Sequence, residues 1–436
     1  MGGLASRESA ARRSARLLLG AALGFILCLS YRGPAIAGAG LVRISDGRES
    51  FPVTVGDTLH PAPGWPVWLK DYTTSARGEK TSGIAFAGGD VLRGRCFVLA
   101  DEVGFLRLCR VHQESDTGGV EVRLGTITAG ESLEEHLADH EVWDFEALSI
   151  DPALRQGTIA AHAAGARGDE IRGAGADGGG DDLFAECAGD TLTGLLSIEG
   201  RGARVEEQTR LLDIRLVRSR ISGASRWQAE VLGDAIPGAR IWNGIIGAER
   251  GFKGLARSAG FLYAGLSDLG FRGDVRVHGT LLFLYDRGRG EIARIPTAPF
   301  GIYSIGGLEA LSDSVTLVVD RSRQALSILR WNPKRAGELV ACHRFFLDLP
   351  APGGFRYGVP TVEGVTVDEA GGIWCVVDPW RGHYRAVDPA APETLQVYLA
   401  AEMPILYRFT GDTVWEQAGL AHLWARPAAE ARGRGR

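Results

Sequence analysis

The sequence has no excess of positive charge and no stripe of basic residues interleaved with aromatic ones. Its 48 lysines and arginines are outnumbered by 53 aspartates and glutamates, which gives a formal net charge of −5. Proteins that bind nucleic acids present basic surfaces to the phosphates. The composition therefore argues against nucleic acid as a partner, and the arginine-rich end, 426–436, is predicted to be a disordered tail.

The sequence also lacks the short motifs of two large hydrolase classes. No Gly-x-Ser-x-Gly nucleophile elbow is present, and the stretch from Gly173 to Gly180 lacks the lysine and Ser/Thr of a phosphate-binding loop. His136 and His140 have the spacing of two zinc ligands on a helix, but Leu137 stands where a zinc protease has its glutamate. These absences leave serine-triad and nucleotide hydrolysis without support.

The apolar run from Leu17 to Ser30 is too short for a comfortable membrane span, which needs roughly 20 residues. Arginines precede this run, and Ala35-Ile36-Ala37 offers small residues around a cleavage point. This is the pattern of a signal peptide. We expect residues 1–37 to be removed and the protein to be exported to the periplasm or outside the cell. An uncleaved leader that anchors the chain in a membrane is the alternative.

Cysteine is scarce, with six residues in the whole chain. Export would place them in an oxidising compartment. A hairpin that turns at Asp101 to Gly104 would put Cys96 directly opposite Cys109, where two cysteines are close enough to bond. The sequence thus predicts a Cys96–Cys109 disulfide, with two separate buried thiols as the alternative.

Glycine is abundant, with 61 residues, and a short motif recurs along the chain. A polar residue, a small residue and an apolar residue begin a strand in five segments, which are Ser82-Gly83-Ile84-Ala85, Glu146-Ala147-Leu148-Ser149, Lys253-Gly254-Leu255-Ala256, Glu309-Ala310-Leu311-Ser312 and Glu363-Gly364-Val365-Thr366. A second strand that ends in an acidic residue follows each motif. These strand ends are Asp101, Glu186, Asp268, Asp320 and Asp378.

The recurring pair of strands predicts an all-β fold, a six-bladed β-propeller, with five blades as the alternative. Propeller repeats are typically about 40–50 residues long. The predicted domain spans 38–425, and a flexible insert rich in Gly and Asp, at about 163–182, lengthens one repeat. Strands near both ends of the chain, at 41–44 and 404–409, would share the last blade.

At these motifs the chain resembles exported propellers of the phytase-like esterase family and the related SdiA-regulated family. The matching pieces are Ser82-Gly83-Ile84-Ala85 with Ala100-Asp101-Glu102, Asp144-Phe145-Glu146-Ala147-Leu148 with Ala185-Glu186, and Asn243-Gly244 before Gly254-Leu255-Ala256. The resemblance covers about 81–379 and implies a six-bladed propeller with calcium or ester chemistry at one end of its channel. Lys253 departs from the pattern, because an acidic residue is expected there.

Three glutamates begin the recurring motif at equivalent places, so the repeat predicts that they converge at the mouth of a central channel. They are Glu146, Glu309 and Glu363, and Asp144 and Asn243 could add further oxygen ligands. Calcium takes 6–8 oxygen ligands, including carboxylates and amides, and would relieve the repulsion between them. The alternative is that Lys253 supplies the positive charge and closes the channel without a metal.

The acidic residues that end the second strands would gather on the loop face, where a substrate could bind. This predicts a role in substrate binding for Asp101, Glu186, Asp268, Asp320 and Asp378, although such residues also commonly accept backbone N–H bonds in turns. Two functions follow from the sequence. The first is a calcium-dependent ester or phosphoester hydrolase, and the alternative is a non-catalytic propeller that binds a small molecule, glycan or protein through its loop face.

Overall fold

The fold is that of a computed structural model, which describes residues 51–69, 81–90, 94–102, 104–113, 119–138, 144–151, 190–200, 205–221, 224–237, 251–267, 271–272, 275–276, 280–358, 360–378 and 384–424. The chain divides into two units, Met1–Arg43 and Ile44–Arg436, and all the described residues belong to the second. The predicted signal peptide, insert and tail lie outside the described residues.

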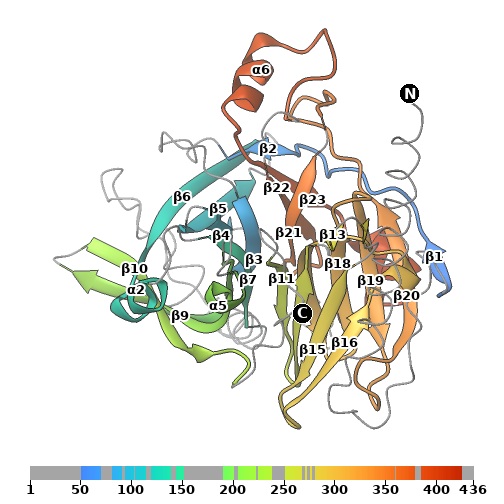
Figure 1. Cartoon of the computed structure of the whole chain (residues 1–436). Helices are drawn as coiled ribbons and strands as arrows, with labels where there is room; N and C mark the ends of the chain where they lie inside the picture. The colour runs from blue at the N-terminus through green and yellow to red at the C-terminus, as the bar shows by residue number, and fades with distance from the viewer. Residues whose placement is uncertain are drawn as a thin grey trace, which may run out of the picture. The chain divides into compact units, whose positions relative to one another are not determined.

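The described chain is nearly all β-structure and repeats a unit of four strands (Figure 1). The first unit consists of β3 (Thr81–Asp90), β4 (Gly94–Asp101), β5 (Leu106–Gln113) and β6 (Val120–Ala129), and the second of β7 (Phe145–Ile150), β8 (Thr191–Ile198), β9 (Arg210–Ile221) and β10 (Ala224–Asp234). The third unit consists of β11 (Phe252–Arg257), β12 (Phe261–Leu266), β15 (Leu281–Asp286) and β16 (Glu291–Pro296). The fourth unit consists of β17 (Ile305–Ser312), β18 (Val315–Asp320), β19 (Ala325–Trp331) and β20 (Leu339–Phe346). Two parallel pairings add to these units. One joins β6 to β10 and so merges the first two units into one eight-stranded sheet, and the other adds β1 (Val53–Val55) beside β20.

The fifth unit combines strands from both ends of the described chain. It consists of β21 (Thr361–Val367), β22 (Ile373–Asp378) and β23 (Ile405–Phe409), and the N-terminal strand β2 (Val67–Trp68) pairs antiparallel with β23. Figure 1 shows the blue β2 beside the orange and red strands of this unit. The sequence predicted such sharing, but with a strand at 41–44 that lies outside the described residues.

The first strands of the five units follow one another in a closed order. β3 contacts β7, β7 contacts β11, β11 contacts β17, β17 contacts β21, and β21 contacts β3 again. Five hydrophobic clusters have the same cyclic arrangement, since each one lies between two successive units. The cluster around Phe97 and Trp374 lies between the first unit and the fifth.

Burial on both faces explains why the strands are apolar nearly throughout. Successive side chains of a strand point to opposite faces. In β4, Phe97 faces the fifth unit whereas Val98 faces the second, and both are fully buried. The predicted all-β, propeller-like repetition is therefore confirmed. The described residues contain five such units, and β13 (Phe271–Arg272) with β14 (Val275–Arg276) forms a separate two-stranded sheet.

The alternation of side chains between the two faces of a sheet shows that the predicted Cys96–Cys109 disulfide is wrong. Cys96 pairs with Arg110 and Cys109 pairs with Phe97, so the hairpin register differs by one residue from the predicted one. A shift of one residue turns a side chain to the other face of the sheet. Cys96 accordingly packs against the second unit and Cys109 against the fifth, and the two buried cysteines form no disulfide with each other. Burial raises the pKa of the Cys109 thiol to about 12.

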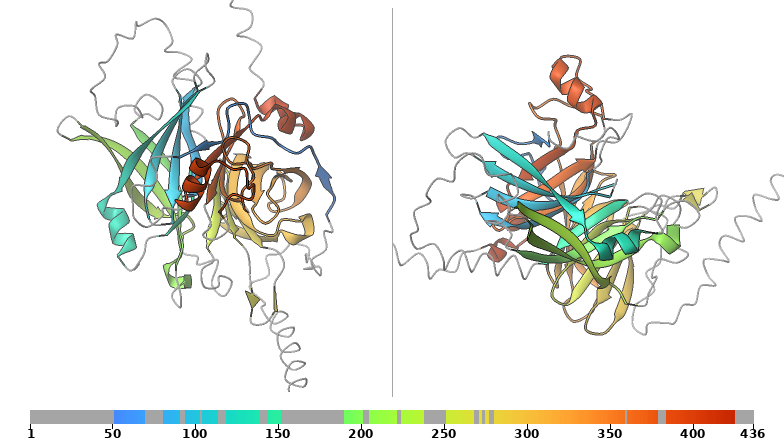
Figure 2. Two further views of the ribbon diagram at one scale, coloured as in Figure 1. Left: turned by 90° about the horizontal axis from the view of Figure 1, so that it is seen from above. Right: turned by 90° about the vertical axis from the view of Figure 1, so that its left-hand side faces the viewer.

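The helices of the described residues are short and lie in connections between strands or after the last strand. They are α2 (Glu131–Leu137), α5 (Val205–Gln208), α6 (Glu393–Ala400) and α7 (Asp412–Gln417). Figure 1 and the right-hand view of Figure 2 show α6 standing away from the strands. Within the described ranges, no helix combines the length and the apolar character that a membrane crossing requires.

The central strands approach closely at the small residue of the recurring motif. A Cβ added at Gly307 would lie 2.8 Å from the backbone nitrogen of Val365, and one at Gly364 would lie 2.8 Å from that of Ile84. Real Cβ atoms do not come so near to backbone. The small residue therefore sets the spacing between neighbouring units.

We expect Gly307→Ala to lower the free energy of unfolding by about 1–3 kcal/mol, because the added methyl group overpacks a backbone contact. Urea unfolding measures this. The matched control is Gly288→Ala, since a Cβ there would meet only Asp286 Oδ1, at 3.4 Å. Equal stability of the two variants would show that the close approach does not constrain the fold.

Candidate functional site

Each of the five central strands has a register irregularity just before its small residue. The residues at these irregularities are Ser82, Glu146, Lys253, Gly306 and Glu363. A β-bulge leaves one residue out of the ladder and re-aims its side chain. The fold thus sets three charged side chains, from three different units, at equivalent positions.

Lys253 is the central cation of this group and is only 8% exposed. Its Nζ forms an ion pair with Glu146 Oε2 and lies 3.3 Å from Glu102 Oε1. Burial alone would lower the pKa of Lys253, but the carboxylates of Glu146 and Glu102 outweigh it and raise the pKa well above its ordinary value. Lys253 is therefore a permanent positive charge that joins three units.

A second buried ion pair compensates Glu363. Arg321 Nη1 lies 2.6 Å from Glu363 Oε1, and Arg321 Nε donates to Ser304 Oγ over 2.8 Å. Burial raises the pKa of Glu363, although Arg321 opposes this. Gly306 has no side chain, so the fourth unit contributes its charge through Arg321, which directly follows β18.

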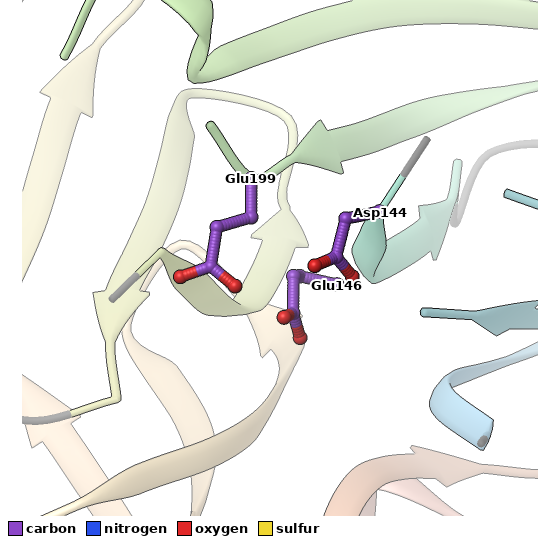
Figure 3. Close-up of side chains that lie close together, drawn as sticks. All are labelled: Asp144, Glu146 and Glu199. Atoms are coloured by element: carbon purple, nitrogen blue, oxygen red, sulfur yellow. The ribbon is translucent and has the colours of Figure 1, made fainter. Parts of the chain in front are cut away.

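Three carboxylates of the second unit form a tight cluster beside Lys253 (Figure 3). Asp144 directly precedes β7, Glu146 lies in β7, and Glu199 directly follows β8. Since the two strands are antiparallel, the start of β7 lies beside the end of β8, and the backbone N–H of Glu199 donates to Asp144 O over 2.9 Å. One oxygen from each side chain lies within 4.8 Å of the others, and all three residues are buried.

Glu199 keeps its proton at neutral pH. Burial first, then the charge of Glu146 and a hydrogen bond with it, raise the pKa of Glu199 from 4.5 to about 10. At neutral pH the side chain is thus a neutral acid in a buried cluster of carboxyl groups. Its packing is close, since a Cβ at Gly251 would lie 3.0 Å from Glu199 Cγ.

The donor set of this cluster fits a hard cation. Carboxylate oxygens are preferred calcium ligands, and buried carboxylates repel one another unless a cation or a proton lies between them. Within the described residues, Oε1 of Glu199 is buried and has no hydrogen-bond partner. Lys253 would compete with a cation for Glu146, but it would still have Glu102 as an ion-pair partner if Glu146 bound the cation.

The structure brings together some of the predicted metal ligands and separates the others. Asp144 and Glu146 are adjacent, whereas Glu363 pairs with Arg321. Glu309 was wrongly placed at the channel mouth. The motif position of the fourth unit is Gly306, three residues earlier, and Glu309 accepts a hydrogen bond from Thr366 Oγ1 over 3.0 Å. Asn243 lies outside the described residues.

Two of the predicted substrate-binding residues are buried turn acceptors. Asp101 accepts from the backbone N–H of Phe105 over 2.9 Å, and Asp320 accepts from that of Tyr303 over 3.0 Å and from Ser322. Neither is exposed on a loop face. Glu186 and Asp268, and the side chain of Asp378, lie outside the described residues.

Glu199 was missed because the second strand of its unit was assigned to residues 183–186. The structure has this strand at β8, and the acidic residue that follows it is Glu199. An acidic residue at the end of the second strand was the very pattern noted in the other repeats. The signal was therefore present, but it was applied to the wrong segment.

No family model matches the chain, and no curated protein matches it. Solved structures match at low similarity. A luciferin-regenerating enzyme has a TM-score of 0.35 and 10% identity over 80% of this chain and 95% of its own. A glycosyl hydrolase from Bacteroides ovatus has a TM-score of 0.36 and 9% identity over 80% of this chain and 90% of its own. Regucalcin, a calcium-binding protein from Agrobacterium tumefaciens, has a TM-score of 0.31 and 10% identity over 83% of this chain and 97% of its own. Likeness at this level assigns no activity to the chain.

We expect the stability of the metal-free protein to fall as the pH rises from 5 to 9. The folded state keeps a proton on Glu199 that the unfolded state has lost, so its stabilising effect is complete below pH 4.5 and disappears as the pH passes about 10. One such proton changes the free energy of unfolding by up to about 1.4 kcal/mol per pH unit.

Urea unfolding at several pH values, with a chelator present, measures this slope. Glu199→Gln should flatten it, because the amide cannot titrate. The control is Glu121→Gln, which removes a carboxylate that is 50% exposed and should leave the slope unchanged. A wild-type slope that Glu199→Gln does not alter would mean that Glu199 is ionised in the folded protein.

Proposed function

We propose that this protein is an exported, five-bladed propeller that binds one divalent cation, calcium by its ligand chemistry, through Asp144, Glu146 and Glu199. The observation that carries the proposal is the convergence of three buried carboxylates from one unit, with ligand oxygens within 4.8 Å of one another. Glu199 Oε1, which lacks a hydrogen-bond partner within the described residues, offers an oxygen for the cation.

The charge balance of the site supports a divalent ion. Two cations, Lys253 and Arg321, each pair with a glutamate. Asp144 and Glu102 add negative charge, and Glu199 adds more once its proton leaves. A bound cation would take over the role of that proton, and Lys253 would keep its pairing with Glu102.

Binding without catalysis is the role that the geometry favours. The cavity on the axis, between Gly83, Lys253 and Glu363, has a volume of about 10 Å³, which is room for about one water molecule. Asp144, Glu146 and Glu199 do not line this cavity, and it is too small for an organic substrate. We therefore propose that the ion stabilises an exported binding protein whose partner is a small molecule, a glycan or a protein, and not a nucleic acid.

A calcium-dependent ester or phosphoester hydrolase is the second candidate. One observation favours it, namely that Glu199, whose pKa is raised to about 10, lies in one cluster with Glu146 and Asp144. Neighbouring carboxyl groups with different proton affinities are the usual arrangement of a general acid and a general base. Calcium, when bound, would supply polarisation of a substrate oxygen. Hydrolysis of model esters that Glu199→Gln abolishes would support this candidate.

Calcium titration of the chelator-treated mature protein by calorimetry tests the proposal. We expect saturable binding of one ion, and a loss of affinity of at least tenfold in both Glu199→Gln and Asp144→Asn, because each change removes a charged ligand. Glu309→Gln is the matched control. It changes a buried glutamate of a central strand that lies outside the cluster, and it should bind as wild type does. Absence of binding heat in the wild type, or equal affinity in all variants, would overturn the proposal.

Export predicts a defined mature N-terminus. When the full chain is expressed in a bacterium that exports it, mass spectrometry of the soluble protein should find a chain that starts at Gly38, since the small residues before it form the cleavage point. A full-length chain in the membrane fraction would instead support the uncleaved anchor.

A further inference from the structure

We infer that a groove between residues 384–389 and α6 binds a short apolar peptide or amino acid in its zwitterionic form, with Arg385 holding the carboxylate and Asp388 the ammonium group. The groove has a volume of about 370 Å³, within the range of small-ligand sites. It belongs to the insertion between β22 and β23, and the site is independent of the carboxylate cluster.

Both walls of the groove are fixed by contacts with the rest of the fifth unit. On one side, Tyr357 and Ala386 form an isolated β-bridge, and the N–H of Gly358 donates to Arg385 O over 2.7 Å. On the other side, Leu395 and Leu399 of α6 are buried in the hydrophobic cluster between the fourth and fifth units. The groove is therefore built into the fold rather than formed by a loose loop.

A turn at Asp388 connects the two walls. Asp388 Oδ1 accepts the N–H of Ala390 over 2.9 Å, and its backbone oxygen accepts the N–H of Ala391 over 3.1 Å. Gln396 Nε2 of α6 donates to Ala391 O over 3.3 Å. These bonds hold the chain where it reverses direction, so that α6 runs back along the strand-like segment. They also leave the second carboxylate oxygen of Asp388 outside the turn.

The lining combines two opposite charges with an apolar surface. Arg385 and Asp388 are both exposed, and within the described part of the chain neither forms an ion pair. Val387, which is 63% exposed, Leu399 and Ala400 supply the apolar part. An arginine fork binds a carboxylate through two hydrogen bonds, and a carboxylate binds an ammonium group. A ligand with both charged ends and an aliphatic body matches all three features.

Leucyl-leucine is the probe, with two analogues that each lack one charge. Its N-acetyl form has no ammonium group, and its C-terminal amide has no carboxylate. Calorimetry or ligand-observed NMR should find saturable one-to-one binding of leucyl-leucine. Arg385→Gln should weaken this binding tenfold or more, yet leave the weaker binding of the amide unchanged. Asp388→Asn retains an oxygen that can accept the N–H of Ala390 in the turn. This variant should weaken the binding of leucyl-leucine but not the binding of its N-acetyl form.

Two controls separate this site from others. Arg330→Gln removes an exposed arginine of the fourth unit and should have no effect. Chelator and Glu199→Gln should also have no effect, so that a failure of the cation proposal is distinguishable from a failure of this one. Absence of saturable binding, or binding that Arg385→Gln and Arg330→Gln alter equally, would overturn the inference.

Discussion

The close approach of the five central strands is the constraint on which the rest of the structure depends. Because neighbouring backbones nearly touch at Gly307 and Gly364, even a methyl group does not fit at these two positions without a shift of the backbone. The residue before the small residue of the motif also needs room for its side chain. The β-bulge provides it, because the bulge takes that residue out of the hydrogen-bonded ladder. The polar residues at the bulges of different units can then meet, as Glu146 and Lys253 do in their ion pair.

Buried charge around this ion pair explains the protonation of Glu199. Moving charges out of water is costly, and their mutual attraction repays the cost only when each has a close partner. Lys253 and Arg321 pair with Glu146 and Glu363, and among the described residues no ion pair is found for Glu199. Glu199 keeps its proton because neutrality then costs less than another buried charge. A cation held by the cluster would satisfy the same electrostatic demand as this proton.

Much of the fold was predictable from the sequence, because small and apolar residues recur with the period of the strands. The motif located β3, β7, β11 and β21 correctly. It failed at the fourth unit because Glu309-Ala310-Leu311-Ser312 repeats the letters of Glu146-Ala147-Leu148-Ser149, while the strand actually bulges at Gly306. The similar sequence at Glu309 suggested the wrong position for the motif, whereas the close approach of the strands requires a glycine at position 307. The hairpin of Cys96 and Cys109 failed for a similar reason, since one residue in the turn decides which face a side chain occupies.

The candidate site was less predictable, because it is a property of one unit and not of the ring. The sequence suggested that equivalent glutamates from several units converge on a metal. The structure instead gathers three acids at the adjoining ends of β7 and β8, and the other units supply only the cations and acids around them. Ring symmetry could not reveal this, because antiparallel pairing within the unit creates the cluster. A cation held there would act on the pairing of β7 with β8, in the eight-stranded sheet that β6 and β10 join, so its effect on stability should be concentrated in the first two units.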